Sequence, residues 1–210
     1  MSASKKFISF EGTEGSGKST QASLLAEHLR KQGHDVILTA EPGGTRIGQK
    51  IRKLLLEPEN HMDPLTELLL YYADRAQHIR EVIDPALEKG SFVITDRFAD
   101  STVAYQGFAR GVDLNIINPL NQMVVGHSKP SLTFILDIDV EEGLRRNRQA
   151  QKEDRFELEA IEFHNRVRSG YLEIAEDEPE RVRVIDASSG QEDIRMKIIE
   201  IVEKIWPSKT

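Results

Sequence analysis

A glycine-rich segment close to the N-terminus matches the pattern G-x-x-x-x-G-K-[ST], and its residues 12–19 read Gly-Thr-Glu-Gly-Ser-Gly-Lys-Ser. It follows directly on a short apolar and aromatic run, Phe7–Phe10, and precedes a helical repeat of Ala22, Leu25 and Leu29. The pattern binds phosphate in this strand–loop–helix context, because glycines let backbone N–H groups approach phosphate oxygens and the helix N-terminus adds positive potential. The segment therefore predicts a nucleotide phosphate site, and a glycine-rich turn without a ligand is the alternative.

Each residue of this loop has an expected part in binding ATP. The Lys18 ammonium can reach the β- and γ-phosphates, and the Ser19 hydroxyl can ligate Mg²⁺, which makes magnesium the cofactor that accompanies ATP. The predicted ATP-binding residues of the loop are Gly12, Thr13, Glu14, Gly15, Ser16, Gly17, Lys18, Ser19 and Thr20. The sequence lacks the motifs Asn-Lys-x-Asp and Asp-x-x-Gly, which argues against a GTPase switch.

Strand-length apolar runs alternate along the chain with helical patterns. The runs are Phe7–Phe10, Val36–Thr39, Phe92–Thr95, Leu132–Leu136 and Val182–Ile185. Because they are continuous rather than alternating, both faces of the sheet are expected to be covered. The order predicts an α/β protein with the P-loop NTPase fold: a five-stranded parallel β-sheet with helices on both faces. We also expect Asp84-Pro85 to kink or end the long helix that starts near Leu65.

Composition limits the classes of function. The chain has 210 residues without an internal repeat or a Gly/Ser/Pro-rich linker, so we expect a single domain, residues 1–210. A net charge of −7 argues against electrostatic binding of nucleic acid over the whole protein surface. The longest apolar run, Leu68–Ala73, is too short to span a membrane. With no cysteine and no apolar leader at the N-terminus, a cytoplasmic location is expected.

Cationic side chains gather at three places despite the acidic average. Arg97 follows Asp96 at the end of the third predicted strand, where side chains face a ligand in sheets of this kind. Arg52 lies one residue off the apolar stripe of its predicted helix. A polar stretch between two helices holds Arg145, Arg146, Arg148, Lys152 and Arg155. Such clusters fit phosphoryl transfer between two nucleotides, in which closely spaced negative charges need compensation.

Further motifs, taken in order, resemble those of the bacterial thymidylate kinases (dTMP kinases), a family of P-loop nucleoside monophosphate kinases. They are Phe10-Glu11-Gly12, Glu41-Pro42-Gly43-Gly44-Thr45, Tyr71–His78, Asp96-Arg97-Phe98, Ala104-Tyr105-Gln106-Gly107 and Arg110-Gly111. The resemblance spans nearly the whole chain. It implies transfer of the γ-phosphoryl group of ATP to dTMP, giving dTDP and ADP, in dTTP synthesis for DNA replication.

The resemblance also implies how dTMP is held. Tyr71 would stack on thymine, and Arg75, on the same helix face, would donate to a base carbonyl. Thr102 and Gln106 would hydrogen-bond the base edge, and Tyr105 would pack under the sugar and leave no room for a 2′-hydroxyl. The other substrate-binding residues would be Glu11 at the 3′-hydroxyl or the water shell of the metal, Pro42 near the sugar, and Arg52 and Arg97 on the monophosphate. A surface cation–π pair of Tyr71 and Arg75, and a core position for Tyr105, are the alternatives.

On the donor side, Arg146 matches the family arginine that lies against adenine, beside a loop matched by residues 186–190. The stretch 147–155 matches the lid of the family. No arginine occupies the variable positions of the glycine-rich loop, so Arg148 or Arg155 is expected to reach the phosphates when the lid closes. The catalytic residues predicted in this way are Lys18, Asp96, Arg97, Arg148 and Arg155, and the metal would be held by Ser19 and Asp96.

Two other functions stay open from the residues. Another P-loop nucleoside or nucleotide kinase would share the glycine-rich loop, Asp96-Arg97 and the lid arginines. A non-catalytic nucleotide-binding regulator would share the loop and transfer nothing. The predicted partners are dTMP and ATP, without nucleic acid or membrane, and the resemblance implies a homodimer formed through the long helix around Leu65–Ile83.

Overall fold

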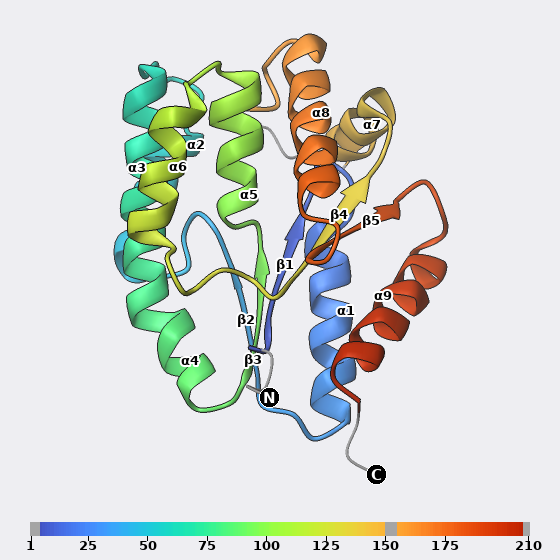
Figure 1. Cartoon of the computed structure of the whole chain (residues 1–210). Coiled ribbons are helices and arrows are strands. Elements are labelled where there is room, and N and C mark those ends of the chain that lie inside the picture. The colour runs from blue at the N-terminus through green and yellow to red at the C-terminus, as the bar shows by residue number, and fades with distance from the viewer. Residues whose placement is uncertain (1–4, 150–154, 208–210) are drawn as a thin grey trace.

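The computed structural model describes residues 5–149 and 155–207, which form a central β-sheet flanked by helices (Figure 1). The strands are β1 (Phe7–Glu11), β2 (Val36–Ala40), β3 (Phe92–Asp96), β4 (Leu132–Asp137) and β5 (Val182–Asp186). All neighbouring pairs are parallel, in the order β2-β3-β1-β4-β5. The predicted α/β fold is confirmed, and each strand extends one residue beyond the predicted run at its carboxyl end.

Helices cover both faces of the sheet. On one face lie α1 (Lys18–Lys31) and α9 (Gln191–Ile205), whose apolar residues share a core with β1, β3 and β4. On the other face α8 (Ile161–Asp177) packs against the π-helical segment η2 (Val103–Ala109), which continues α5 (Ala99–Thr102). The remaining helical elements are α2 (Arg46–Leu56), α3 (Pro64–His78), η1 (Ile79–Ile83), α4 (Asp84–Glu88), α6 (Leu114–Val124) and α7 (Val140–Gln149).

The sheet order places the site. β1 lies at the centre of the sheet, and every one of its residues is buried. Because the strands are parallel, the carboxyl ends of β1 and β3 lie at the same edge. The glycine-rich loop follows β1, and Asp96-Arg97 lies at the end of β3. The topology therefore brings together two sequence signals that are far apart along the chain.

The long helix predicted from Leu65 changes its hydrogen-bonding pattern at Asp84-Pro85 instead of ending there. α3 passes into the π-helical η1, and α4 begins at Asp84 with Pro85 in its first turn. Proline lacks the N–H that an α-helix uses, and the wider turn before it accommodates the missing bond. The helix ends before Gly90, whose φ of 81° suits glycine.

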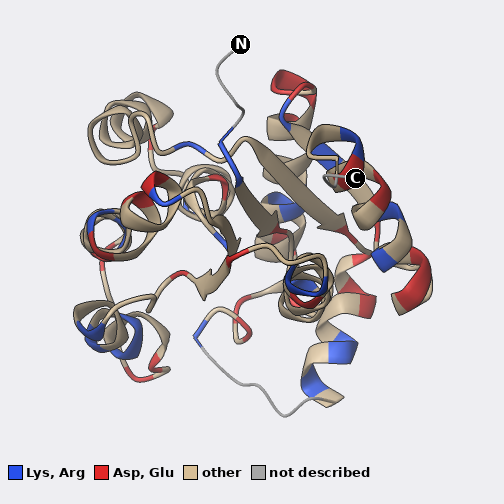
Figure 2. Cartoon of the chain, turned by 90° about the horizontal axis from the view of Figure 1, so that it is seen from below, with Lys and Arg blue, Asp and Glu red and all other residues tan. Residues whose placement is uncertain are grey.

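Charged residues of both signs are interspersed on the helices, whereas the strands are drawn almost wholly in tan (Figure 2). Apolar strands surrounded by charged helices are what the continuous apolar runs predict. No helix within residues 5–149 and 155–207 is long and apolar enough to cross a membrane.

Candidate active site

The glycine-rich loop between β1 and α1 wraps around the side chain of Lys18. Lys18 is buried, and its Nζ donates to the Thr13 carbonyl oxygen at 2.7 Å. Burial and the neighbouring charge of Arg97 lower the pKa of Lys18 to about 8. At the start of α1 the Ser19 hydroxyl donates to the carboxylate of Asp96, at the end of β3. The residues predicted to bind phosphate and metal therefore lie together.

The loop also touches the backbone of α7, the helix that leads into the predicted lid. A Cβ atom on Gly15 would lie 1.9 Å from the Gly143 carbonyl oxygen, and one on Gly143 would lie 2.4 Å from the Glu14 carbonyl oxygen. Glycine at both positions allows this close approach. Further along α7, Arg146 donates to the Ala187 carbonyl oxygen at 3.1 Å. The two segments predicted to lie beside adenine are thus neighbours.

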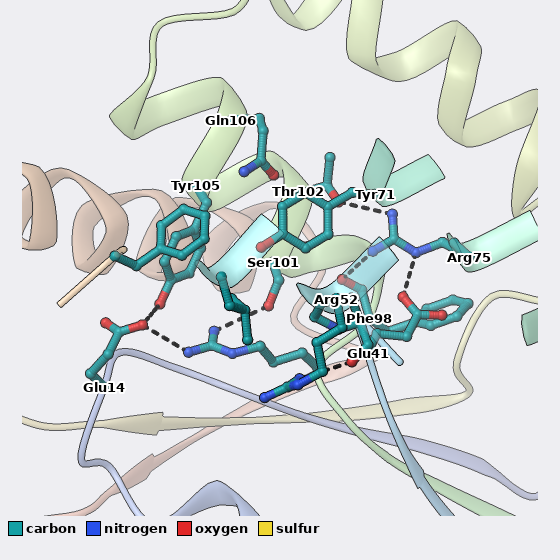
Figure 3. A pocket seen from close by; sticks show the side chains of 14 residues that line it. Glu14, Glu41, Arg52, Tyr71, Arg75, Phe98, Ser101, Thr102, Tyr105 and Gln106 are labelled. Atoms are coloured by element: carbon teal, nitrogen blue, oxygen red, sulfur yellow. Dashed lines mark hydrogen bonds and ion pairs between the residues drawn. The ribbon is translucent and has the colours of Figure 1, made fainter. Parts of the chain in front are cut away.

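Beside the loop opens a cavity, which we call the inner cavity, with about 520 Å³ of empty space that includes open solvent. Figure 3 shows Tyr71, Thr102 and Tyr105 between Glu14 at one end and Arg75 at the other. The predicted substrate-binding residues that line the inner cavity are Pro42, Arg52, Tyr71, Arg75, Arg97, Thr102, Tyr105 and Gln106. A second cleft, the loop cleft, runs along the glycine-rich loop and shares with the inner cavity Glu14, Glu41, Pro42, Arg52 and Arg97. Ligands in the two cavities would meet at these residues.

Arg97 lies where the two cavities join. Its φ of 70° is in the left-handed region, which residues other than glycine rarely adopt. Its Nη1 donates to the Gly12 carbonyl oxygen and to Tyr171 OH, each at 3.2 Å, and its Nη2 donates to Glu14 at 3.0 Å. The guanidinium also lies 4.9 Å from the centre of the Tyr105 ring. An arginine held in a strained conformation beside a phosphate loop points to a role as a phosphate ligand.

Arg75 is buried at one end of the inner cavity. Its Nε donates to Glu41 at 2.8 Å, its Nη1 to Thr102 Oγ1 at 2.8 Å, and its Nη2 to the Phe98 carbonyl oxygen at 3.0 Å. The other carboxylate oxygen of Glu41 lies 2.9 Å from His78 Nδ1. These bonds to described residues use three of the five guanidinium N–H groups, so Arg75 is fixed in place with donors left for a ligand.

The two tyrosines line the inner cavity, as expected. The alternative of a surface cation–π pair for Tyr71 and Arg75 is wrong, because Arg75 is only 1% exposed. The Tyr71 ring instead lies 6.4 Å from the ring of Phe156. Tyr105 is buried and also faces the cavity, and its hydroxyl donates to Glu14 at 2.5 Å.

Asp74, on α3, is a buried carboxyl group next to this network. Its Oδ1 accepts from Gly43 N at 3.0 Å, while its Oδ2 has no hydrogen-bond partner in the described part of the chain. Burial and the negative charge of Glu41 raise the pKa of Asp74 from 3.8 to about 6. The folded protein therefore binds this proton more tightly than the unfolded chain, and the stability that it contributes is lost as pH rises through 6.

Asp74→Asn is expected to remove this pH dependence, because asparagine does not titrate. At about pH 4 and below, the free energies of unfolding of the two proteins should follow each other. Between about pH 4 and pH 7 the wild type should lose up to roughly 3 kcal/mol relative to Asp74→Asn. Urea unfolding at a series of pH values measures the difference, and parallel curves across that range would contradict the raised pKa.

Gln106 is held by a second buried carboxylate. Its Nε2 donates to Glu67 at 2.8 Å, and the other oxygen of Glu67 lies 2.6 Å from Arg155 Nη2. Arg155 also donates through Nε to the Leu55 carbonyl oxygen at 2.9 Å. The structure therefore places Arg155 against α2 and α3, beside the carboxylate that holds Gln106.

Of the rest of the predicted lid, the structure describes residues 147–149. Residues 147–149 continue α7, and Arg148 among them is exposed and forms no hydrogen bond or ion pair with the residues that the structure describes. Residues 150–154, Lys152 included, lie outside the described residues.

Glu11, at the end of β1, is buried beneath the site. Its carboxylate accepts from Phe98 N at 2.8 Å and from Ser101 Oγ at 2.6 Å. Burial and the charge of Asp100 raise the pKa of Glu11 to about 7. Glu11 lines neither described cavity, but Phe98 and Ser101, which donate to its carboxylate, both line the inner cavity.

Several residues to which the sequence analysis gave no role belong to the site. They are Glu41 beside Arg75, Glu67 beside Gln106, Gly143 against the glycine-rich loop, and His164, whose Nδ1 lies 3.2 Å from Glu14. Glu67 precedes the buried Leu68, and His164 lies between the buried Phe163 and Val167. A polar residue on the buried face of a helix is the signal that would have found both.

Fold and site together define the class of protein. A parallel sheet with a phosphate loop after its central strand, and an arginine at the end of the neighbouring strand, belongs to P-loop nucleotide-binding enzymes. The inner cavity gives room for a second ligand where the loop cleft ends, as phosphoryl transfer requires. The chain is an ATP-dependent kinase of this class.

Comparison with known proteins identifies the family. A family model described as thymidylate kinase matches residues 10–198. Thymidylate kinase of Syntrophotalea carbinolica is 49% identical over 207 residues, covering 95% of this chain and 93% of the relative. That of Halothermothrix orenii is 51% identical over 195 residues, covering 91% and 93%. The crystal structure of thymidylate kinase from Ehrlichia chaffeensis has a TM-score of 0.79 and 37% identity over 95% of this chain and 98% of that one. The chain belongs to the thymidylate kinase family.

Proposed function

We propose that the protein transfers the γ-phosphoryl group of ATP to dTMP, giving dTDP and ADP, a step in dTTP synthesis for DNA replication. The observation that supports this most directly is the junction of the inner cavity and the loop cleft at Arg97. Catalysis of such a transfer is largely positioning and charge stabilisation. A guanidinium held at that junction can neutralise oxygens of both nucleotides.

The inner cavity is the proposed dTMP site. Tyr71 would stack on thymine, and the donors that Arg75 has left would face its carbonyl oxygen. Thr102 and Gln106 would meet the base edge, and Tyr105 would lie under the sugar. The phosphate end is proposed to lie at Arg52, which already donates to the Pro42 carbonyl oxygen at 2.8 Å, and at Arg97. Glu11 would act indirectly, by holding Phe98 N and the Ser101 hydroxyl through hydrogen bonds.

The loop cleft is the proposed ATP site, with the phosphates on residues 12–20 and adenine beside Arg146. Ser19 and Asp96 offer a hydroxyl and a carboxylate, hard oxygen ligands that fit Mg²⁺. When bound, the metal would neutralise charge on the β- and γ-phosphates. Lys18 would exchange its bond to the Thr13 carbonyl for a phosphate oxygen. Arg148 or Arg155, at the two ends of the proposed lid 147–155, would add the remaining positive charge.

The acceptor is tested by measuring ADP formation in a coupled assay with dTMP, dUMP, dCMP and thymidine. The highest kcat/KM is expected with dTMP. A preference for another monophosphate would favour a different nucleotide kinase, and a preference for thymidine would favour a nucleoside kinase. ATP binding without ADP formation with any acceptor would favour a non-catalytic regulator.

Tyr105→Ala is expected to narrow the preference for dTMP over its ribose counterpart by about tenfold to hundredfold, because the ring fills the space a 2′-hydroxyl would need. Tyr105→Phe is the matched control, since it keeps the ring and removes only the hydroxyl bonded to Glu14. Ratios of kcat/KM for the two nucleotides measure the effect. An unchanged preference in Tyr105→Ala would show that the ring does not select the sugar.

We further propose that the enzyme is a homodimer and acts in the cytoplasm. Exposed apolar side chains lie on three helices that run side by side in Figure 1, α2, α3 and α6. They are Ile47, Leu54, Leu65, Leu69, Ile116 and Met123. Such a surface favours association with a second copy. Analytical ultracentrifugation gives the mass in solution, and a monomer at assay concentrations would contradict the dimer.

A further inference from the structure

The side chain of Glu14 connects the glycine-rich loop to three other elements. Its carboxylate accepts hydrogen bonds from Arg97 Nη2 at 3.0 Å, from Tyr105 OH at 2.5 Å and from His164 Nδ1 at 3.2 Å. Figure 3 shows the bond from Tyr105 to Glu14 as a dashed line at one end of the inner cavity. Glu14 also lines the loop cleft, so its carboxylate lies where the two proposed substrates meet.

The three bonds are divided unequally between the two carboxylate oxygens. Arg97 and Tyr105 both donate to Oε1, whereas His164 donates to Oε2. Among the described residues His164 is the one hydrogen-bond partner of Oε2. Without it the carboxylate would be held only through Oε1, by Tyr105 and Arg97, and its plane could turn about the last side-chain bond.

His164 itself is placed where a polar ring has few partners. It is 1% exposed, on the face of α8 that also buries Phe163 and Val167. A carboxylate only accepts hydrogen bonds, so Nδ1 must carry the proton. Its Nε2 has no hydrogen-bond partner in the described chain. The single hydrogen bond that the ring makes to a described residue is therefore the one to the phosphate loop.

The hydrogen bond from His164 matters because Glu14 is negatively charged. Burial alone would raise the pKa of Glu14, but the hydrogen bond from His164 and the charges of Arg97 and Lys18 outweigh burial and hold its pKa well below the usual range. Glu14 is thus an anion beside the cation that binds phosphate. The position of the Glu14 carboxylate therefore affects whether the Arg97 guanidinium points toward a ligand.

We propose that His164 is a positioning residue for phosphoryl transfer, whose Nδ1–H fixes the Glu14 carboxylate so that Glu14 in turn holds Arg97 in its transfer geometry. This inference rests on the proposed function, because it concerns the same reaction. It gives α8 a part in catalysis although the described linings of both cavities do not include His164.

Three substitutions at position 164 separate positioning from packing. His164→Leu keeps the bulk and removes the donor. His164→Asn places an amide N–H close to the position of Nδ1, whereas His164→Gln, which is also polar, carries its amide one bond too far. We expect kcat to fall about tenfold to hundredfold in the Leu and Gln variants, and to stay within about threefold of wild type in the Asn variant. The KM for dTMP should change less than kcat, because base recognition lies at the other end of the cavity.

The same variants are compared in a Glu14→Gln background, in which the positioned carboxylate is gone. There, His164→Leu should lower kcat by no more than about twofold further. The inference is overturned if His164→Leu turns over like wild type, or if all three variants lose activity in step with a lower unfolding midpoint. If His164→Leu does not fold, the kcat values of His164→Asn and His164→Gln are compared instead. Equal values in these two variants would overturn the inference. A wild type that forms no ADP with dTMP would instead contradict the proposed function.

Discussion

Arg97→Lys is expected to lower kcat for dTMP phosphorylation by about a thousandfold while the protein stays folded. Lysine keeps the positive charge beside Glu14, but it is a single ammonium group. It cannot hold the Gly12 carbonyl, the Tyr171 hydroxyl and Glu14 while also binding phosphate, as the planar guanidinium can. The coupled ADP assay measures the loss, and the thermal unfolding midpoint checks the fold.

Two further variants test whether the loss of activity is specific to the Arg97 guanidinium. Arg97→Ala should be as inactive as Arg97→Lys and also less stable, because it leaves the largely buried Glu14 without its cation. Arg195→Lys is the matched control: Arg195 pairs with Glu192 on α9, and neither residue is in the described lining of either cavity. Turnover of Arg97→Lys close to that of the control would remove Arg97 from the transfer step.

Arg75→Met is expected to cost about 3–5 kcal/mol of folding free energy, the range for breaking a buried ion pair from one side. Arg75 and Glu41 are both almost completely buried, with their charged groups 2.8 Å apart. Methionine fills much of the space but leaves His78 Nδ1 as the remaining side-chain hydrogen-bond partner of the Glu41 carboxylate among the described residues. Urea unfolding of the ligand-free protein measures the change.

The double variant Glu41→Gln/Arg75→Met tests the cause. If the cost comes from an uncompensated charge, the neutral amide should restore at least half of the lost stability. Lys204→Met breaks the exposed pair with Glu200 and should change stability by less than about 1 kcal/mol. A double variant no more stable than Arg75→Met would attribute the loss to packing rather than charge.

The strands and the glycine-rich loop could be predicted because their signals are local. Each strand is a continuous apolar run, and the predicted runs differ from the observed strands by a single residue at one end. The positions of Tyr71 and Arg75 on one helix face likewise follow from helix geometry. The order of the strands then brings Asp96 beside Ser19, which the general rule for parallel sheets anticipates.

The carboxylates that hold the cavity arginines could not be predicted in this way. Glu41 lies after β2 and Arg75 on α3, and only the packing of these elements joins them. The family resemblance assigns Arg155 to the lid, whereas its side chain contacts Glu67 and the Leu55 carbonyl oxygen. Such partners depend on which helices meet, and a single sequence does not report that. The assigned roles of the site residues stay predictions.

The backbone contact of Gly15 with Gly143 makes the phosphate loop and the first half of α7 a single frame. No side chain separates the two segments there, so neither can shift without displacing the other. Arg146, which we propose to lie beside adenine, and the loop that we propose to bind the triphosphate would then belong to one rigid unit.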